Sequence, residues 1–252
     1  MEEISLKTPA QIALMVKGGK KLAQIRDLLV SKVKPGVKTI ELDQLAEAEI
    51  LTFGGQPSFK TVRDYKYTTC ISINDEVVHG IPSARAIQLG DVVKIDLGMI
   101  FGSLHTDTTE TVQVKSQKEM EIEKFLLVGE KTLKEAIKMA KAGNRIGQIS
   151  QVIEENITQA GYSPVRVLTG HGVGKCLHEE PAIPQILQGR IEDTPEIVPG
   201  MTLAIEVIYN QGSSEIVLRK DGWTIATADG KISATFEKSI AVEKDGTFVL
   251  TP

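Results

Sequence analysis

Four carboxylates in this chain occupy positions where an isolated negative charge would be costly. Asp96 follows a short apolar run, and Asp107 comes 11 positions later, the spacing expected when two strands of a hairpin each present one acid. Glu206 lies in an uncharged apolar run, and Glu237 follows another strand-like segment. Carboxylates gathered in one place share a proton or bind metal. The alternative is that Asp96 and Asp107 are surface turn acids and that Glu237 faces solvent on an edge strand.

A histidine among glycines is the second chemical signal. His171 lies in the segment Thr169-Gly-His-Gly-Val-Gly174, where glycine lets the backbone come close and leaves the imidazole room to reach a metal or a substrate. A phosphate-binding loop is the competing interpretation of Gly174-Lys175. That loop requires a glycine where this chain has Thr169 and a hydroxyl residue where it has Cys176, so we reject a nucleotide site.

The chain contains an internal duplication with a constant offset. Residues 34–58 align without gaps on residues 141–165, which lie 107 positions later, and each segment is preceded by a long amphipathic helical pattern. The strand-like segment that ends at Asp96 matches the one that ends at Glu206. Chance similarity between helix-rich segments explains one such match, but several matches in the same order indicate two related halves.

The histidines follow the same duplication. The chain has four of them. His79-Gly-Ile-Pro in the first half matches His178-Glu-Glu-Pro in the second. His105 precedes Asp107 by two residues on a predicted strand and therefore shares its face. An ordinary packed or exposed histidine is the simpler explanation of His105, so we place it outside the site.

The duplication predicts the architecture. We expect an α/β (α+β) fold in which two pseudo-symmetric halves, about 1–115 and 116–252, form one curved and mainly antiparallel sheet with helices outside. The whole chain, 1–252, then forms a single domain. Matching polar residues of the two halves converge in a central cleft, so we expect one site built from both.

Composition excludes several classes of function. A net charge of −4 and a pI near 5.7 give no general attraction to phosphate backbones, so we expect no nucleic-acid specificity. The first residues, Met1-Glu-Glu-Ile4, carry acids where a signal peptide has basic residues, and no apolar run approaches the roughly 18 residues that a membrane span requires. We therefore expect a cytoplasmic protein without membrane contact, in which Cys70 and Cys176 stay reduced.

Taken together, these motifs resemble the metal-ligand pattern of the pita-bread fold metallopeptidase family. The resemblance covers nearly the whole chain. Within the family, the chain resembles the type I methionine aminopeptidase branch. It rests on Asp96, Asp107, Thr169-Gly-His-Gly-Val-Gly174, His178-Glu-Glu-Pro181, Ile205-Glu206 and Phe236-Glu237, together with Ile73-Asn74, His79-Gly-Ile-Pro82 and Asp221-Gly-Trp223.

The resemblance implies a role for each residue. The family binds two divalent metal ions, with Asp107 and Glu237 as the bridging positions. The catalytic positions are His79 and His178, which contact the substrate, and Glu206, which accepts and passes on a proton. The implied metal ligands are Asp96, Asp107, His171, Glu206 and Glu237. One histidine and four carboxylates accept Co, Mn, Fe or Zn, so the sequence leaves the metal undecided.

The resemblance also implies an apolar pocket for a methionine side chain. Cys70, Leu177 and Trp223 match its wall positions, although an aromatic residue is common where this chain has Leu177. The sequence does not decide whether Tyr65 or Tyr67 also lines this pocket.

Three further residues depart from the usual pattern of the family. Val207 stands where proline usually follows the glutamate, and Thr235 and Lys238 are unusual neighbours of Glu237. These departures bear on side-chain preference rather than on metal binding.

The implied activity is removal of the N-terminal methionine from nascent proteins, near the ribosome, by a monomer. A proline-directed aminopeptidase of the same fold competes, but it typically has an arginine where this chain has Thr235 and a large additional N-terminal domain. A non-catalytic peptide-binding relative would have lost ligands, whereas all five positions are filled. A third alternative is that the acids only close a hydrogen-bonded interface between the halves.

Overall fold

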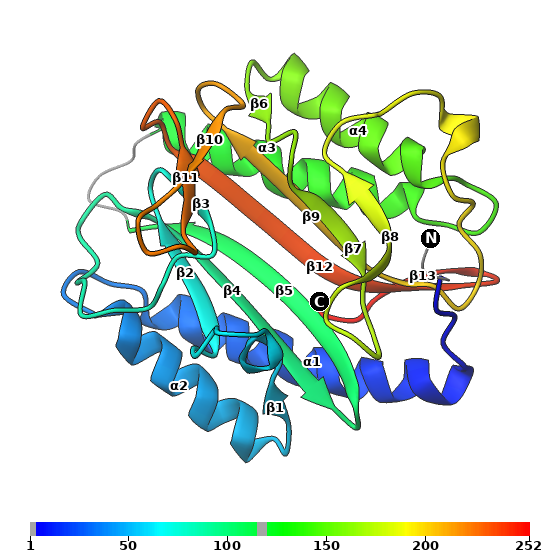
Figure 1. The fold of residues 1–252 in the computed structure, drawn as a ribbon, viewed down its shortest axis with the longest axis horizontal. Helices are drawn as coiled ribbons and strands as arrows, with labels where there is room; N and C mark the ends of the chain where they lie inside the picture. Colours follow the sequence, from blue (N-terminus) through cyan, green and yellow to red (C-terminus); the bar gives the residue numbers. More distant parts are fainter. Residues whose placement is uncertain (1–3, 115–119) are drawn as a thin grey trace.

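The computed structural model describes residues 4–114 and 120–252 (Figure 1). The acidic residues at positions 2 and 3 and the expected boundary between the halves, at 115/116, lie outside the described residues. Within the described residues, no helix is both long enough and apolar enough to span a membrane.

Long helices form where the apolar periodicity predicts them. The α-helices are α1 (Pro9–Lys32), α2 (Thr39–Thr52), α3 (Met120–Met139) and α4 (Ile146–Gln159). Helix α1 begins with a capping box, in which the Thr8 hydroxyl accepts from the Gln11 amide at 3.3 Å and the Gln11 side chain accepts from the Thr8 amide at 2.9 Å. Pro9 occupies the first turn, where its missing N–H costs nothing.

The strands form two sheets. They are β1 (Gln56–Pro57), β2 (Thr69–Ile73), β3 (Glu76–Val78), β4 (Val92–Phe101), β5 (Leu104–Gln113), β6 (Ser163–Pro164), β7 (Thr169–Gly172), β8 (Glu179–Pro184), β9 (Thr202–Asn210), β10 (Ile216–Leu218), β11 (Ile225–Thr227), β12 (Ser233–Glu243) and β13 (Gly246–Val249). The larger sheet has the order β1-β4-β5-β12-β9-β7-β8, with β2 added to β4, β6 to β9 and β13 to β12. Every strand pairing in the described residues is antiparallel, and β5 pairs with β12 where the halves meet.

The helices cover one face of the larger sheet. In β9 and β12, alternate residues such as Val207 and Phe236 join the buried apolar cluster under α3 and α4, while Glu206 and Glu237 point to the other face. Ile95 of β4 packs in the same way under α1 and α2. Figure 1 shows the two helix pairs along opposite sides of the view, with β4, β5, β12 and β9 running between them. The polar face of the sheet is thus left free for a site.

The two halves repeat their turns as well as their elements. Helices α2 and α4, and strands β1 and β6, are each separated by 107 residues. Gly36 and Gly143 have φ of 89° and 86°, and Gly54 and Gly161 have φ of 75° and 85°, a conformation that side chains disfavour. Matched left-handed turns at a constant offset explain why these glycines recur in the aligned sequence.

A small second sheet has no counterpart among the predictions. It has the order β10-β11-β3 and stands beside the larger sheet. His79 directly follows β3 with a φ of 59°, and Trp223 lies in the turn between β10 and β11. Its task is therefore to present these two side chains to the polar face.

Candidate active site

One row of paired residues crosses five strands on the polar face. Cys70 pairs with Asp96, Asp96 with Thr109, Thr109 with Glu237, and Glu237 with Glu206. Residues that pair directly point to the same side of a sheet. Three of the four predicted acids therefore gather because of strand register.

A second row adds the remaining predicted ligands. Asp107 lies two residues before Thr109 and so shares its face. His171 pairs with Ala204, which lies two residues before Glu206. One ligand atom from each of Asp107, His171 and Glu237 lies within 4.8 Å of the others. The cluster thus joins acids of β4, β5, β12 and β9 to a histidine of β7.

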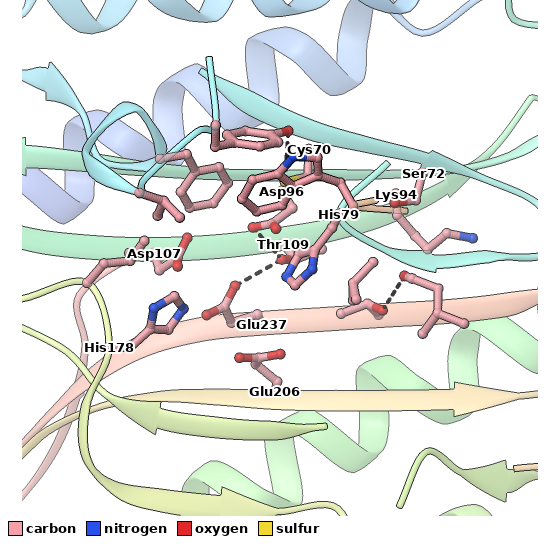
Figure 2. A pocket seen from close by; sticks show the side chains of 18 of the residues that line it. Cys70, Ser72, His79, Lys94, Asp96, Asp107, Thr109, His178, Glu206 and Glu237 are labelled. Atoms are coloured by element: carbon pink, nitrogen blue, oxygen red, sulfur yellow. Dashed lines mark hydrogen bonds between the residues drawn. The ribbon is translucent and has the colours of Figure 1, made fainter. Parts of the chain in front are cut away.

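Hydrogen bonding within the cluster is incomplete. The Thr109 hydroxyl lies 3.0 Å from Asp96 Oδ1 and 2.9 Å from Glu237 Oε2 (Figure 2). A hydroxyl has one hydrogen, so it donates to one of these carboxylates only. Glu237 Oε1 is buried without any hydrogen-bond partner. An orphaned carboxylate oxygen facing other acids and a histidine fits a bound cation.

Electrostatics supports the same conclusion. Burial, first of all, raises the pKa of Asp96, Glu206 and Glu237, and the neighbouring carboxylates raise these pKa values further. Burial raises the pKa of Asp107 to about 7. A divalent cation among these groups would favour their ionised forms and remove the cost of gathering them.

His171 is oriented as a metal ligand requires. Its Nδ1 lies 2.8 Å from the carbonyl oxygen of Gly172, which can only accept, so Nδ1 carries the hydrogen. Nε2 is then unprotonated and lies 3.4 Å from Glu206 Oε1. Burial lowers the pKa of His171 to about 4, so the imidazole is neutral at pH 7.

His79 and His178 reach the cluster from outside the larger sheet's central strands. Burial lowers the pKa of both imidazoles, and His178 lowers that of His79 further. The rings of His178 and His171 lie 4.5 Å apart, edge to face. Figure 2 shows His79 and His178 on either side of the carboxylates. Two neutral imidazoles can therefore donate hydrogen bonds to a substrate there.

All ten predicted site residues line one cavity of about 140 Å³. Its apolar end is formed by Cys70, Leu177 and Trp223, together with Tyr65, which stacks edge-on against Trp223 at 4.9 Å between ring centroids. An apolar cavity of roughly 150 Å³ holds a ligand the size of benzene. The cavity as a whole is therefore about large enough for one side chain.

Several lining residues were missed in the sequence. Thr109 shares the face of Asp107, and Lys94 shares that of Asp96, each two residues away. The period of a strand was the available signal, but threonine and lysine alone suggest no chemistry. Lys94 is buried, with 1% of the residue exposed. Its amine points away from the acids and donates to the Asn74 and Ser233 carbonyls.

The three residues that depart from the family's pattern, Thr235, Val207 and Lys238, lie on different faces of the larger sheet. Thr235 lines the cavity and donates its hydroxyl to the Val77 carbonyl. Val207 packs in the apolar cluster under α3 and α4, and Lys238 lies 3.6 Å from Glu110 on the same face. Val207 and Lys238 therefore do not line the cavity.

The lining of the cavity shows which of Tyr65, Tyr67 and His105 belong to the site. Tyr65 lines the cavity, whereas Tyr67 packs behind it in the same aromatic cluster. His105 is buried, with its Nδ1 3.0 Å from Ser58 Oγ, and is not among the lining residues.

Known proteins are similar to this chain in sequence. A model of metallopeptidase family M24 matches residues 13–244. The chain belongs to this family. A methionine aminopeptidase of Clostridium perfringens is 40% identical over 248 residues, which cover 98% of both chains. Methionine aminopeptidase 1 of Bacillus subtilis is 39% identical, over 98% of this chain and 99% of its own length. The family predicted from the metal-ligand motifs is confirmed.

Solved structures place the fold in the same group. The crystal structure of a methionine aminopeptidase from Thermotoga maritima has a TM-score of 0.94 and 36% identity, and the similarity covers 99% of both chains. This confirms the pita-bread fold with its mainly antiparallel sheet. A prolidase from Pyrococcus horikoshii has a TM-score of 0.78 at 23% identity, and this chain covers 63% of it, so that similarity concerns the fold alone.

Proposed function

We propose that this M24 metallopeptidase acts as a methionine aminopeptidase, removing the N-terminal methionine of newly made proteins. The observation that carries the proposal is the adjacency of the carboxylate cluster to an apolar pocket for one side chain, in a chain similar over its whole length to methionine aminopeptidases. The proline-directed alternative is disfavoured because the prolidase from Pyrococcus horikoshii is similar at the level of the fold, at 23% identity, whereas the methionine aminopeptidase of Clostridium perfringens is 40% identical.

The metal centre of this proposal uses the residues already described. The ligands are two carboxylates of the β4–β5 hairpin, two of β9 and β12, and the histidine of β7: Asp96, Asp107, Glu206, Glu237 and His171. We propose two divalent ions, drawn from Mn, Fe, Co or Zn. When bound, such ions supply Lewis acidity at the scissile carbonyl and allow a water to ionise near neutral pH.

The protein's own groups then move the protons. Glu206 would be kept ionised by bound cations, so its carboxylate can take a proton from the attacking water and pass it to the leaving amine. His178 donates an imidazole N–H to the carbonyl oxygen as negative charge develops there, and His79 donates to the substrate from the other side. Both histidines are suited to this because burial keeps them neutral.

The pocket determines which terminus is accepted. Cys70, Leu177, Tyr65 and Trp223 offer apolar and aromatic surface and the polarisable sulfur of a thiol, which suit an unbranched thioether. The cavity of about 140 Å³ has room for about one side chain, which suits recognition of a single N-terminal residue. We propose that cleavage is confined to the first residue.

The test is hydrolysis of Met-Ala-Ser beside Ala-Pro-Ala by metal-stripped protein to which Mn, Co or Fe is returned. Metal-dependent release of methionine alone supports the proposal. Cleavage of Ala-Pro-Ala would move the protein to the proline-directed branch. Two bound metals without turnover of either peptide would contradict the proposed substrate.

The setting of the activity follows from its substrate. We propose nascent N-termini near the ribosome as the partner, a cytoplasmic location, and a monomer without nucleic-acid specificity. Sedimentation of the purified protein tests the monomer, since a dimer would double the sedimenting mass of 27.4 kDa.

A further inference from the structure

A buried lysine outside the site lies under the loop that carries His178. Lys7 belongs to the extended segment that precedes α1, and only 1% of its side chain is exposed. Its backbone amide donates to the Gly200 carbonyl at 2.7 Å. Its ammonium forms an ion pair with Glu179 and donates to the Ser5 carbonyl at 3.1 Å. A buried ammonium is stable only when paired in this way.

The partner of Lys7 is the residue that follows His178. One Glu179 oxygen accepts from Lys7, and the other, Oε1, accepts from the Cys176 amide at 2.9 Å. The Glu179 carboxylate thus links the residue after His178 to the backbone amide of Cys176, two residues before His178. Both contacts restrain the short segment that carries the imidazole.

The stem of Lys7 is matched to the same loop. A Cβ placed on Gly174 would lie 2.1 Å from Lys7 Cε, so the lysine occupies the space where any other residue's side chain would be. On its other side the loop is held by β5, because the His105 amide donates to the Gly174 carbonyl at 2.6 Å. The loop is therefore clamped between Lys7 and His105.

The loop faces open space on the side of the N-terminal segment. A second cavity of about 540 Å³ lies there. It is lined by residues 4–6 of the N-terminal segment and by Lys175, Cys176, His178, Glu179 and Glu180 of the loop. Space of this kind lets a loop move unless a specific contact holds it. Glu179 lines this space, and its ion pair with Lys7 is a specific contact of that kind.

We propose that Lys7 is a positioning residue that acts through Glu179 to hold the His178 imidazole against the reacting carbonyl. The inference rests on the proposed function, because it assigns Lys7 to the same reaction. Lys7 touches no substrate. Its effect is expected on the rate of the chemical step rather than on metal binding, since misplacement of a catalytic group by about 1 Å can cost as much as 10²-fold in rate.

The experiment compares Lys7→Met and Glu179→Gln with the full-length enzyme. Both variants remove the ion pair while keeping the size of the side chain. We expect kcat for Met-Ala-Ser to fall about tenfold in each, with KM and metal content nearly unchanged. Lys21→Met is the matched control, because Lys21 is a lysine of α1 whose amine donates to the Phe53 carbonyl and does not line the cavity.

The decisive measurement is made in a His178→Ala background. If Lys7 acts through His178, Lys7→Met costs the wild-type enzyme about tenfold in kcat and the His178→Ala enzyme almost nothing. Equal losses in both backgrounds, or no loss in the wild-type background, would overturn the inference.

A second readout does not depend on activity. The imidazole ¹H–¹⁵N signal of His178 should shift or broaden in Lys7→Met and Glu179→Gln and stay in place in Lys21→Met. An unchanged His178 signal in both variants contradicts the positioning role even if no peptide is cleaved. Absence of methionine release by the metal-loaded wild type, by contrast, counts against the proposed function alone.

Discussion

At the scale of single residues, Glu237 is a buried carboxylate whose hydrogen bonding is incomplete. One oxygen contacts Thr109, and the other is buried without a partner. We predict that Glu237→Gln lowers metal affinity and kcat/KM by more than about 100-fold, because even loss of a residue that only supports a metal ligand costs 10- to 100-fold. Metal content after dialysis and peptide turnover measure the two effects.

The control for that prediction is Glu110→Gln. Glu110 is a neighbouring carboxylate on β5, but it lies 3.6 Å from Lys238 on the helix-covered face. Its substitution should leave metal content unchanged. Equal metal loss in both variants would show that the effect comes from the fold and not from the ligand.

The pocket yields a second prediction at this scale. Trp223→Ala removes an aromatic wall that packs against Tyr65, and we expect kcat/KM for Met-Ala-Ser to fall about tenfold, which corresponds to roughly 1.4 kcal/mol of lost apolar contact. The loss should be smaller for a peptide that begins with a bulkier residue. Unchanged preference between the two peptides would remove Trp223 from the pocket, and metal content serves as the control.

Residue types explain which part of the site was predictable. Acids in apolar runs and a histidine among glycines carry chemical information in the sequence alone, whereas Cys70, Leu177 and Trp223 were implied only by the resemblance to the family; both groups lie in one cavity. Thr109, Lys94 and Tyr65 carry no such signal, because each type is common in ordinary strands and loops. Only the strand register shows that Thr109 stands between Asp96 and Glu237.

At the scale of elements, α3 depends on one glycine for its contact with the sheet. A Cβ on Gly129 would lie 2.6 Å from the ring of Phe236 and from the Tyr209 hydroxyl. We predict that Gly129→Ala lowers the free energy of unfolding by about 1–3 kcal/mol through overpacking, although alanine favours helix by about 1 kcal/mol. Urea unfolding measures this effect. Lys131→Ala, at an exposed position of α3, should change stability by less than about 0.5 kcal/mol.

Elements also show where prediction from the sequence ends. The duplication was visible because Gly36 and Gly143 occupy the same left-handed turn 107 residues apart, a constraint that only glycine meets easily. The sheet of β3, β10 and β11 was not predicted, since its strands are three residues long and lack a clear alternation. Short strands are determined by their tertiary partners rather than by local sequence.

At the scale of the whole molecule, the site lies on the seam between the halves. Asp96 and Asp107 belong to the first half, His171, Glu206 and Glu237 to the second, and β5 pairs with β12 between them. The gathered acids oppose this pairing when no cation is present, whereas an ion bound by the proposed ligands would join the two halves. Metal binding and global stability are therefore linked.

This linkage gives the molecule a predictable dependence on pH. Burial raises the pKa of Asp107 to about 7, and Asp96, Glu206 and Glu237 are raised as well, whereas unfolded carboxyls titrate near pH 4. Between these pH values the metal-free fold holds protons that the unfolded chain has released, so these groups lower its stability as pH rises. Metal binding displaces those protons. His171 has a pKa of about 4 and is already neutral in this range.

We therefore predict that the difference in unfolding free energy between metal-loaded and metal-free protein grows from pH 5.5 to pH 7.5. Each proton displaced adds up to about 1.4 kcal/mol per pH unit to this difference. Urea unfolding with Mn or with a chelator measures this difference. Taking the difference cancels the contributions that lysines and histidines away from the metal make to the pH dependence of both forms. Asp107→Asn, which has no proton to displace at that position, should show a shallower increase. A difference that shrinks as pH rises would mean that these carboxylates do not hold the metal.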